Sequence, residues 1–338
     1  MGVYIKRVTY ECNFFKYTVM IVFCSKLVRF VGVLTQTFSL KHNIFYTHLF
    51  SLPWILVFFC LVFIPRCYGQ SRTIRVGSEE NSYVRQLLDL ALSASDWRDQ
   101  YQFIYNQDLV QSKERQVRLI AKSKFIDITA LAVTKQRMDR LRAIQIPIYF
   151  GALGYRVFLI NNKNQSKFTG ISSIKELRRL NAIFVNGWAD TQVLENNKIP
   201  TFITSNRQLA YSMIERNRGD YFPRGLHEVL SDYRENVEQF PSLAIGQRLA
   251  LYYPLPVYYF VSYQSEELAQ QVEKGLLKVL SDGGMRTLFL EHFAESIQSL
   301  NLAKRNVIEL HNDGLPSDIN LPSLKQWQSY IQSQVLDK

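Results

Sequence analysis

Arg137 is the residue whose type and setting most clearly suggest chemistry. It lies three positions after Thr134 in the stretch D-I-T-A-L-A-V-T-K-Q-R, where an apolar run typical of a buried strand ends in a polar turn. A guanidinium can hold a carboxylate through two parallel hydrogen bonds, so an arginine at a strand end suits the binding of an anionic group. The alternative is a surface arginine on the first turn of a helix with Asp139. Arg140 and Arg142 fit a solvated surface better.

Other candidate contacts also follow predicted strands. In open α/β sheets, ligands bind beyond the carboxyl ends of strands and often between lobes. Trp188, beside Gly187, could stack on a ligand ring or pack in the core, and Arg224 stands on a turn between Pro223 and Gly225. The predicted ligand contacts are Glu79, Ala132, Thr134, Arg137, Gly187, Trp188, Thr191, Tyr221 and Arg224.

Common catalytic motifs are missing from the sequence. It has no G-x-S-x-G, H-E-x-x-H, Walker A or G-x-G-x-x-G in the context that each requires. Three histidines without a ligand pattern follow residue 69, and all four cysteines precede it. We therefore predict no catalytic residues, no cofactor and no metal site. A dehydratase, the enzyme alternative, would need an acid–base pair, for which Glu79 with Glu228 or His227 is the candidate.

Residues 1–69 differ in composition from the rest. An apolar run from Leu49 to Ile64 follows a basic lead and precedes Cys67-Tyr68-Gly69, a suitable signal-peptidase site. The run is short for a bilayer span, which takes about 20 residues. It predicts a signal cleaved near Gly69/Gln70 and a periplasmic location, with a retained signal anchor as the rival. A start codon assigned too far upstream would explain the long lead.

The remaining chain has a mild positive charge. It carries 33 basic and 28 acidic side chains, a net charge of +5, spread along its length. Nucleic-acid binding needs basic residues gathered on one face, so we predict solvated surface charge and no nucleic-acid partner.

The order of apolar patterns predicts an α/β fold. Strands at 73–77, 101–105 and 125–133 alternate with helices at 84–91 and 113–124, which favours a mainly parallel sheet. A second α/β unit follows, in which Ser173, Asp190 and Asn206 are expected to cap helices.

A hydrophobic return strand is predicted at 249–262, broken by Pro254 and Pro256. Helices from Ser265 and from Met285 come after it. The predicted first lobe comprises 72–154 plus 250–338, and the predicted second lobe comprises 155–249. The chain would cross between the lobes near Tyr155 and near Pro256.

The I-R-V-G strand and the core D-I-T-A-L-A-V-T-K-Q-R, followed by I-P-I-Y, resemble the periplasmic solute-binding proteins of the amino-acid-binding type. This is bacterial family 3, with the type II periplasmic binding fold, and the resemblance covers about residues 72–300 in layout. It implies two α/β lobes, each with a mainly parallel mixed sheet, that close over a small solute. Thr134 and Arg137 match the family's T-x-x-R turn, which implies that Arg137 holds a ligand carboxylate. Gly187 and Thr191 match loosely a second-lobe loop that contacts the same group.

Two departures bear on the ligand. Ala130 and Ala132 stand where amino-acid binders carry hydroxyl residues, and Arg224 stands where they carry an acid for the ligand ammonium. We therefore expect an exported monomer that captures a small polar, anionic or amino-acid-like ligand for a membrane permease of an ABC transporter. A ligand bridging Arg137 and Arg224 through two anionic groups is one hypothesis. The alternatives are a sensing protein without transport and a dehydratase-type enzyme on the same scaffold.

Overall fold

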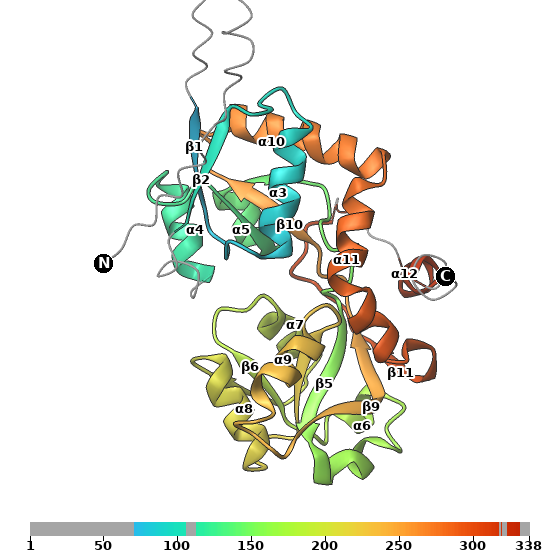
Figure 1. Ribbon diagram of the computed structural model, residues 1–338. Coiled ribbons are helices and arrows are strands. Elements are labelled where there is room, and N and C mark those ends of the chain that lie inside the picture. The colour runs from blue at the N-terminus through green and yellow to red at the C-terminus, as the bar shows by residue number, and fades with distance from the viewer. Residues whose placement is uncertain (1–70, 106–112, 318, 320–322, 332–338) are drawn as a thin grey trace, which may run out of the picture. The chain divides into compact units, whose positions relative to one another are not determined.

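The computed structural model describes residues 71–105, 113–317, 319 and 323–331 (Figure 1). The chain divides into two compact units, Met1–Gln70 and Ser71–Lys338. The predicted leader, signal and cleavage site lie outside the described residues. Within the described part, no helix is long and apolar enough to cross a membrane.

The second unit alternates strands and helices along its length. Its elements are β1 (Arg72–Val76), α3 (Tyr83–Ser93), β2 (Tyr101–Tyr105), α4 (Lys113–Ala121), β3 (Ile128–Ala132), α5 (Lys135–Arg140), β4 (Arg142–Ile144), β5 (Tyr155–Asn161), η2 (Asn162–Phe168), α6 (Ile174–Leu177), β6 (Ala182–Val185), α7 (Asp190–Asn196), β7 (Thr201–Thr204), α8 (Arg207–Glu215), β8 (Tyr221–Gly225), α9 (Val229–Asn236), β9 (Leu243–Tyr252), β10 (Val257–Val261), α10 (Glu266–Ser281), α11 (Gly284–Ser299), η3 (Leu302–Lys304), β11 (Asn306–Glu309) and α12 (Leu324–Ile331).

The first sheet has the strand order β2-β1-β3-β10-β4. β1 runs parallel to β2 and β3, and β10 runs antiparallel to β3 and β4. Helices α3 and α10 pack on one face, and α4 packs on the other with Val117 and Ile120 buried. α10 can approach α3 closely because Gly275 has no Cβ. A Cβ at this position would overlap the carbonyl oxygen of Ala91.

The second sheet has the strand order β11-β9-β5-β8-β6-β7. Its central strands β5 and β8 are fully buried, since helices cover both faces. Ala210, Tyr211 and Ile214 of α8 lie in one hydrophobic cluster, whereas Val193 and Leu194 of α7 lie in another. We call the first sheet with its helices the first lobe and the second sheet with its helices the second lobe.

The mixed α/β, two-sheet fold confirms the predicted fold class. The predicted return strand is two strands in different sheets, because prolines at 254 and 256 lack the N–H that would continue the ladder. Residues 250–252 and 306–309, which the sequence assigns to the first lobe, pair with each other in the second sheet. The exact lobe boundaries stay a prediction.

Local signals predicted several helix starts correctly. Ser173 forms a capping box with Glu176, and Asn206 accepts a hydrogen bond from the backbone of Leu209. The prediction for Asp190 was wrong, because α7 begins at Asp190 itself and its carboxylate faces the buried Arg156 instead. The third strand also begins later than predicted, since Phe125 has a φ of 65° and is 60% exposed.

Three segments connect the two sheets. The first leads from β4 to β5 and the second from β9 to β10. These two are hydrogen-bonded to each other, since the amide of Tyr253 donates to the carbonyl of Gly154 at 3.2 Å. The third lies after β11, where Asn312 Nδ2 donates to the carbonyl of Pro254 at 2.8 Å. The amide of Lys135, the first residue of α5, then donates to the carbonyl of Gly314 at 3.1 Å. The predicted crossings near Tyr155 and Pro256 are therefore joined by a C-terminal crossing that the sequence did not reveal.

Candidate ligand-binding site

The turn between β3 and α5 positions Arg137. Thr134 is the N-cap of α5, and its hydroxyl accepts a hydrogen bond from the amide of Arg137 at 3.2 Å. The apolar strand I-T-A-L-A is buried in the first sheet, so the turn is fixed at the carboxyl end of β3. A T-x-x-R sequence produces this geometry because the threonine satisfies an amide that helix geometry leaves free.

Arg137 is only 6% exposed, and its guanidinium folds back over the turn. Nη1 donates to the carbonyl of Ala132 at 2.8 Å, and Nη2 lies 3.3 Å from Glu114 Oε1. Nη2 also donates to the carbonyl of Gly187, in the second lobe, at 3.4 Å. Burial lowers the pKa of Arg137 below its ordinary value, against the attraction of Glu114 and Asp190. The group stays charged at neutral pH because its ordinary pKa is so high.

Further cations lie near Arg137. Burial, together with the charges of Arg137 and Arg207, lowers the pKa of Lys113 to about 8, whereas Glu79 opposes the shift. Lys113 begins α4 in the first lobe and Arg207 begins α8 in the second. Positive charges from both lobes therefore act on one another at this site.

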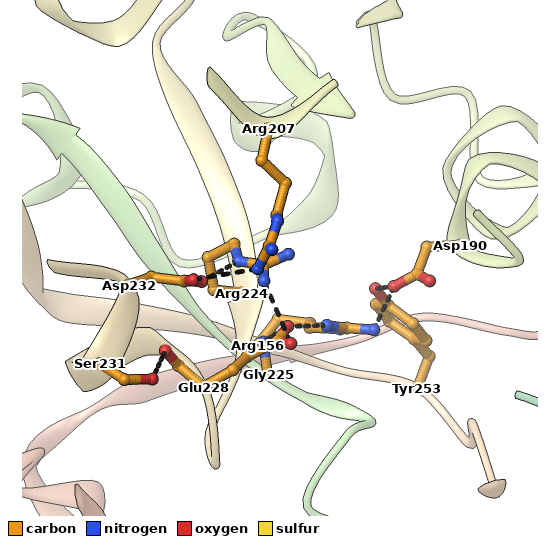
Figure 2. Close-up of polar contacts among 9 residues, drawn as sticks. All are labelled: Arg156, Asp190, Arg207, Arg224, Gly225, Glu228, Ser231, Asp232 and Tyr253. Carbon is orange, nitrogen blue, oxygen red and sulfur yellow. Dashed lines mark hydrogen bonds and ion pairs between the residues drawn. The ribbon is translucent and has the colours of Figure 1, made fainter. Parts of the chain in front are cut away.

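In the second lobe, Arg224 is held in a buried ion-pair network (Figure 2). Its guanidinium pairs with Asp232, and Nη2 lies 3.1 Å from Glu228 Oε2. The ring of Trp188 lies over it, 4.8 Å from centroid to Cζ. Arg207 approaches the same cluster, with Nη1 3.7 Å from Asp232 Oδ1.

A second buried arginine completes the network. Arg156, on β5, pairs with Asp190, and its Nη1 lies 3.3 Å from Glu228 Oε1. The hydroxyl of Tyr253 donates to Asp190 Oδ2 at 2.7 Å. Three arginines (Arg156, Arg207 and Arg224) thus face three carboxylates (Asp190, Glu228 and Asp232), so the network is balanced in charge.

The proposed dehydratase pair is poorly suited to proton transfer at neutral pH. Although burial opposes it, the charges of Arg224, His227 and Arg156 lower the pKa of Glu228 to about 2. Burial, against the attraction of Glu228, lowers the pKa of His227 to about 4. General catalysts work best with a pKa near the working pH. In the described residues, no hydrogen bond or ion pair joins Glu79 to either group.

The structure brings most predicted contacts together but not all. Ala132, Thr134, Arg137 and Gly187 are linked by hydrogen bonds, and Trp188 contacts Arg224. Glu79 is exposed and acts on Lys113 through its charge. The hydroxyl of Thr191 is buried and has no hydrogen-bond partner among the described residues.

Tyr221 lies apart from these contacts. It stands at the start of β8, not at its carboxyl end, and it packs in the core with its ring 4.5 Å from that of Phe158. Sequence reasoning missed Lys113, Glu114 and Arg207. All three stand in the first turn of a helix. Glu114 and Arg207 differ from other surface charges by their ion pairs with Arg137 and Asp232, and Lys113 by its electrostatic interaction with Arg137.

The described residues contain no metal site, and two surface cavities formed by them lie away from the candidate site. Among the described residues, no group of three or more His, Cys, Asp or Glu side chains could hold a metal ion. Two surface cavities, of about 600 and 470 Å³, contain none of the predicted contacts. The larger cavity is lined by basic side chains near the end of α11, including that of Arg305. Arg305 donates to the carbonyl of Leu300 and so satisfies the helix terminus.

Comparisons with known proteins identify the fold. No protein-family model matches the chain, and no curated protein matches its sequence. The ligand-binding core of GluR0, solved with L-glutamate, has a TM-score of 0.50 at 11% identity, covering 66% of this chain and 98% of that one. A histidine kinase sensor domain similar to periplasmic binding proteins has a TM-score of 0.50 at 13% identity, covering 66% and 96%.

An arginine-specific periplasmic binding protein of Salmonella typhimurium has a TM-score of 0.49 at 15% identity, covering 66% of this chain and 99% of that one. At such identities the likeness concerns the fold alone. The chain has the two-lobed fold of periplasmic binding proteins, and the resemblance drawn from the T-x-x-R core is confirmed at that level.

Proposed function

We propose that this protein is an exported binding protein whose two lobes close over a small solute with an anionic group, held by Arg137. The observation that carries the proposal is the position of Arg137. It is a buried, permanently charged guanidinium on a capped turn at the end of a strand, and it reaches across to the second lobe at Gly187. Burial strengthens the interaction of such a charge with an anion because there is less water to screen it.

The ligand would take the place of an internal partner. Glu114 contacts Arg137 at 3.3 Å, and its side chain is 43% exposed. A carboxylate this exposed gains little from its ion pair, so it can turn into water while a ligand carboxylate occupies the guanidinium. The hydroxyl of Thr191, which has no hydrogen-bond partner in the part of the chain that the structure describes, would supply a further hydrogen bond.

The expected partner is a membrane permease, with a sensor protein as the alternative. Binding proteins whose lobes close on a ligand offer a different surface in the closed state, which a second protein can recognise. Among the fold neighbours, the sensor domain supports the sensor alternative, and the ligand-binding core solved with L-glutamate supports a small-molecule ligand. The fold also favours a periplasmic location and a ligand in the size range of an amino acid.

A thermal-shift screen tests the proposal. The purified full chain would be mixed with acetate, succinate, glutarate, L-glutamate and L-arginine, and a ligand that binds only the folded form should raise the melting temperature with concentration. Arg137→Met should abolish that rise, and Arg137→Lys should restore little of it because lysine cannot form the paired hydrogen bonds. Arg140→Met, an exposed arginine of the same helix, is the control. The proposal fails if no carboxylate stabilises the protein or if Arg137→Met responds like the wild type.

A further inference from the structure

The second-lobe side of the candidate site, which we call its wall, is the ion-pair network of Arg156, Asp190, Arg207, Arg224, Glu228 and Asp232. Arg224 is the cation at the centre of this wall. Arg224 is 2% exposed, pairs with Asp232 and lies 3.1 Å from Glu228. Arg137 donates to the carbonyl of Gly187, and the next residue, Trp188, lies over the guanidinium of Arg224, with 4.8 Å between the ring centroid and Cζ. Arg224 therefore contacts, through Trp188, the same loop whose Gly187 carbonyl accepts a hydrogen bond from Arg137.

The carboxylates of this wall are all taken up by arginines of the chain. Asp190 is paired with Arg156, Glu228 lies between Arg156 and Arg224, and Asp232 lies between Arg224 and Arg207 (Figure 2). No acid of this network is left over for a positively charged ligand. An ammonium group placed here would meet three guanidinium groups and find its natural partners already occupied.

The first-lobe side adds to the same effect. Lys113 and Arg137 carry positive charge toward the site, and both interact with charges of the second lobe, Arg207 and Asp190 respectively. Glu114 and Glu79 balance them only from partly or fully exposed positions. Losing water without gaining a partner is costly for any charged group, so an ammonium would be disfavoured on both sides.

Resting on the proposed function, we propose that Arg224 determines the ligand class: the site accepts carboxylic acids that lack an amino group and excludes amino acids. Arg224 supplies internally the positive charge that an amino acid would bring. It contacts the wall and not the ligand carboxylate, so its effect is on selectivity and not on the anchoring of the acid group.

Pairs of probes that differ only in the amino group test this inference by calorimetry on the purified full chain. Suitable pairs are glutarate with L-glutamate, succinate with L-aspartate, and propionate with L-alanine. In the pair that binds best, the plain acid should bind at least about ten-fold more tightly than the amino acid. An amino acid that binds as tightly as its plain acid overturns the inference and leaves the proposed function intact. If no acid of either kind binds, both fail.

Arg224→Gln should reduce the ratio of the two affinities, because it removes one of the two arginine partners of Asp232 and of Glu228 and so leaves these carboxylates available to an ammonium group. The double variant Arg224→Gln/Asp232→Asn removes one charge of each sign and protects against a folding defect from unpaired buried carboxylates. The ratio within a pair is the readout, since a general loss of stability would weaken both ligands alike. Arg234→Gln, which breaks an exposed pair with Glu295, is the matched control. An unchanged ratio in both Arg224 variants overturns the inference.

Discussion

Glu114 competes with any ligand carboxylate for Arg137, because its Oε1 already lies 3.3 Å from Nη2. Glu114→Gln keeps the size of the side chain and removes its charge. We expect carboxylate binding to tighten by up to about five-fold, which corresponds to an exposed ion pair of up to about 1 kcal/mol. Calorimetry with the best acid of the screen measures the change. Glu238→Gln, an exposed glutamate of the second lobe, should have no effect, and weaker binding to Glu114→Gln would contradict the competition.

His227 should make stability depend on pH in mildly acidic solution. Burial lowers its pKa from 6.5 to about 4 in the folded protein. Between these values the unfolded chain binds a proton that the folded chain does not. The free energy of unfolding should therefore fall as the pH is lowered through this window, by at most about 1.4 kcal/mol per unit.

His227→Gln removes the group that binds this proton, so the slope of the free energy of unfolding against pH should be smaller between pH 5 and 6.5. Urea unfolding at several pH values measures it, with the exposed His311→Gln as the control. Glu228 acts at lower pH, because its pKa of about 2 means that its stabilising contribution is lost as the pH falls below about 4.5. A slope that is equal in His227→Gln and wild type would assign the effect to other groups.

At the scale of elements, packing and helix propensity make opposite predictions at Gly275. Alanine is intrinsically better than glycine inside a helix, by about 1 kcal/mol. A Cβ at this position, however, would overlap the carbonyl oxygen of Ala91 on α3, which is backbone and cannot turn aside. Overpacking typically costs about 1–3 kcal/mol, so packing should win and Gly275→Ala should destabilise the protein. Urea unfolding gives the sign. Gly170→Ala, where no heavy atom lies within 4 Å, is the control.

Local chemistry explains what the sequence could predict about these elements. The cap at Ser173 and the strand break at Pro254 depend on neighbouring residues, so both could be predicted from short stretches. The T-x-x-R turn was visible for the same reason. Asp190 shows the limit, because a residue of the preferred capping type instead satisfies Arg156, 34 positions earlier in the chain. Such a partner is fixed by tertiary packing and leaves no local pattern.

The same distinction applies to the candidate site. Arg137 could be singled out because a strand and a turn lie beside it in sequence. Glu114 and Gly187 could not be assigned to it, since they contact it from 23 and 50 residues away. Arg224 was predicted as a ligand contact from its rigid turn, but that turn gives no information on Asp232, which faces it from the next helix.

At the scale of the whole molecule, the C-terminal crossing joins the second lobe to the element that carries Arg137. Asn197 in the second lobe holds the backbone of His311, and Asn312 holds the carbonyl of Pro254. Gly314 then accepts the amide of Lys135, and Leu315 packs against the buried cluster of α4 and β3. Motion between the lobes must therefore bend this segment as well as the two crossings beside Gly154 and Tyr253.

Asn312→Ala should loosen this restraint, because it removes a side-chain hydrogen bond worth about 1 kcal/mol at the centre of the crossing. Spin labels at cysteines introduced for Gln102 and Lys198, one in each lobe, would report the distance between the lobes. The four natural cysteines all precede residue 70 and can be replaced with serine. We expect a broader distance distribution in Asn312→Ala than in the labelled parent, and no broadening in the control Asn196→Ala. Equal distributions in the two variants would show that the first two crossings alone set the freedom of the lobes.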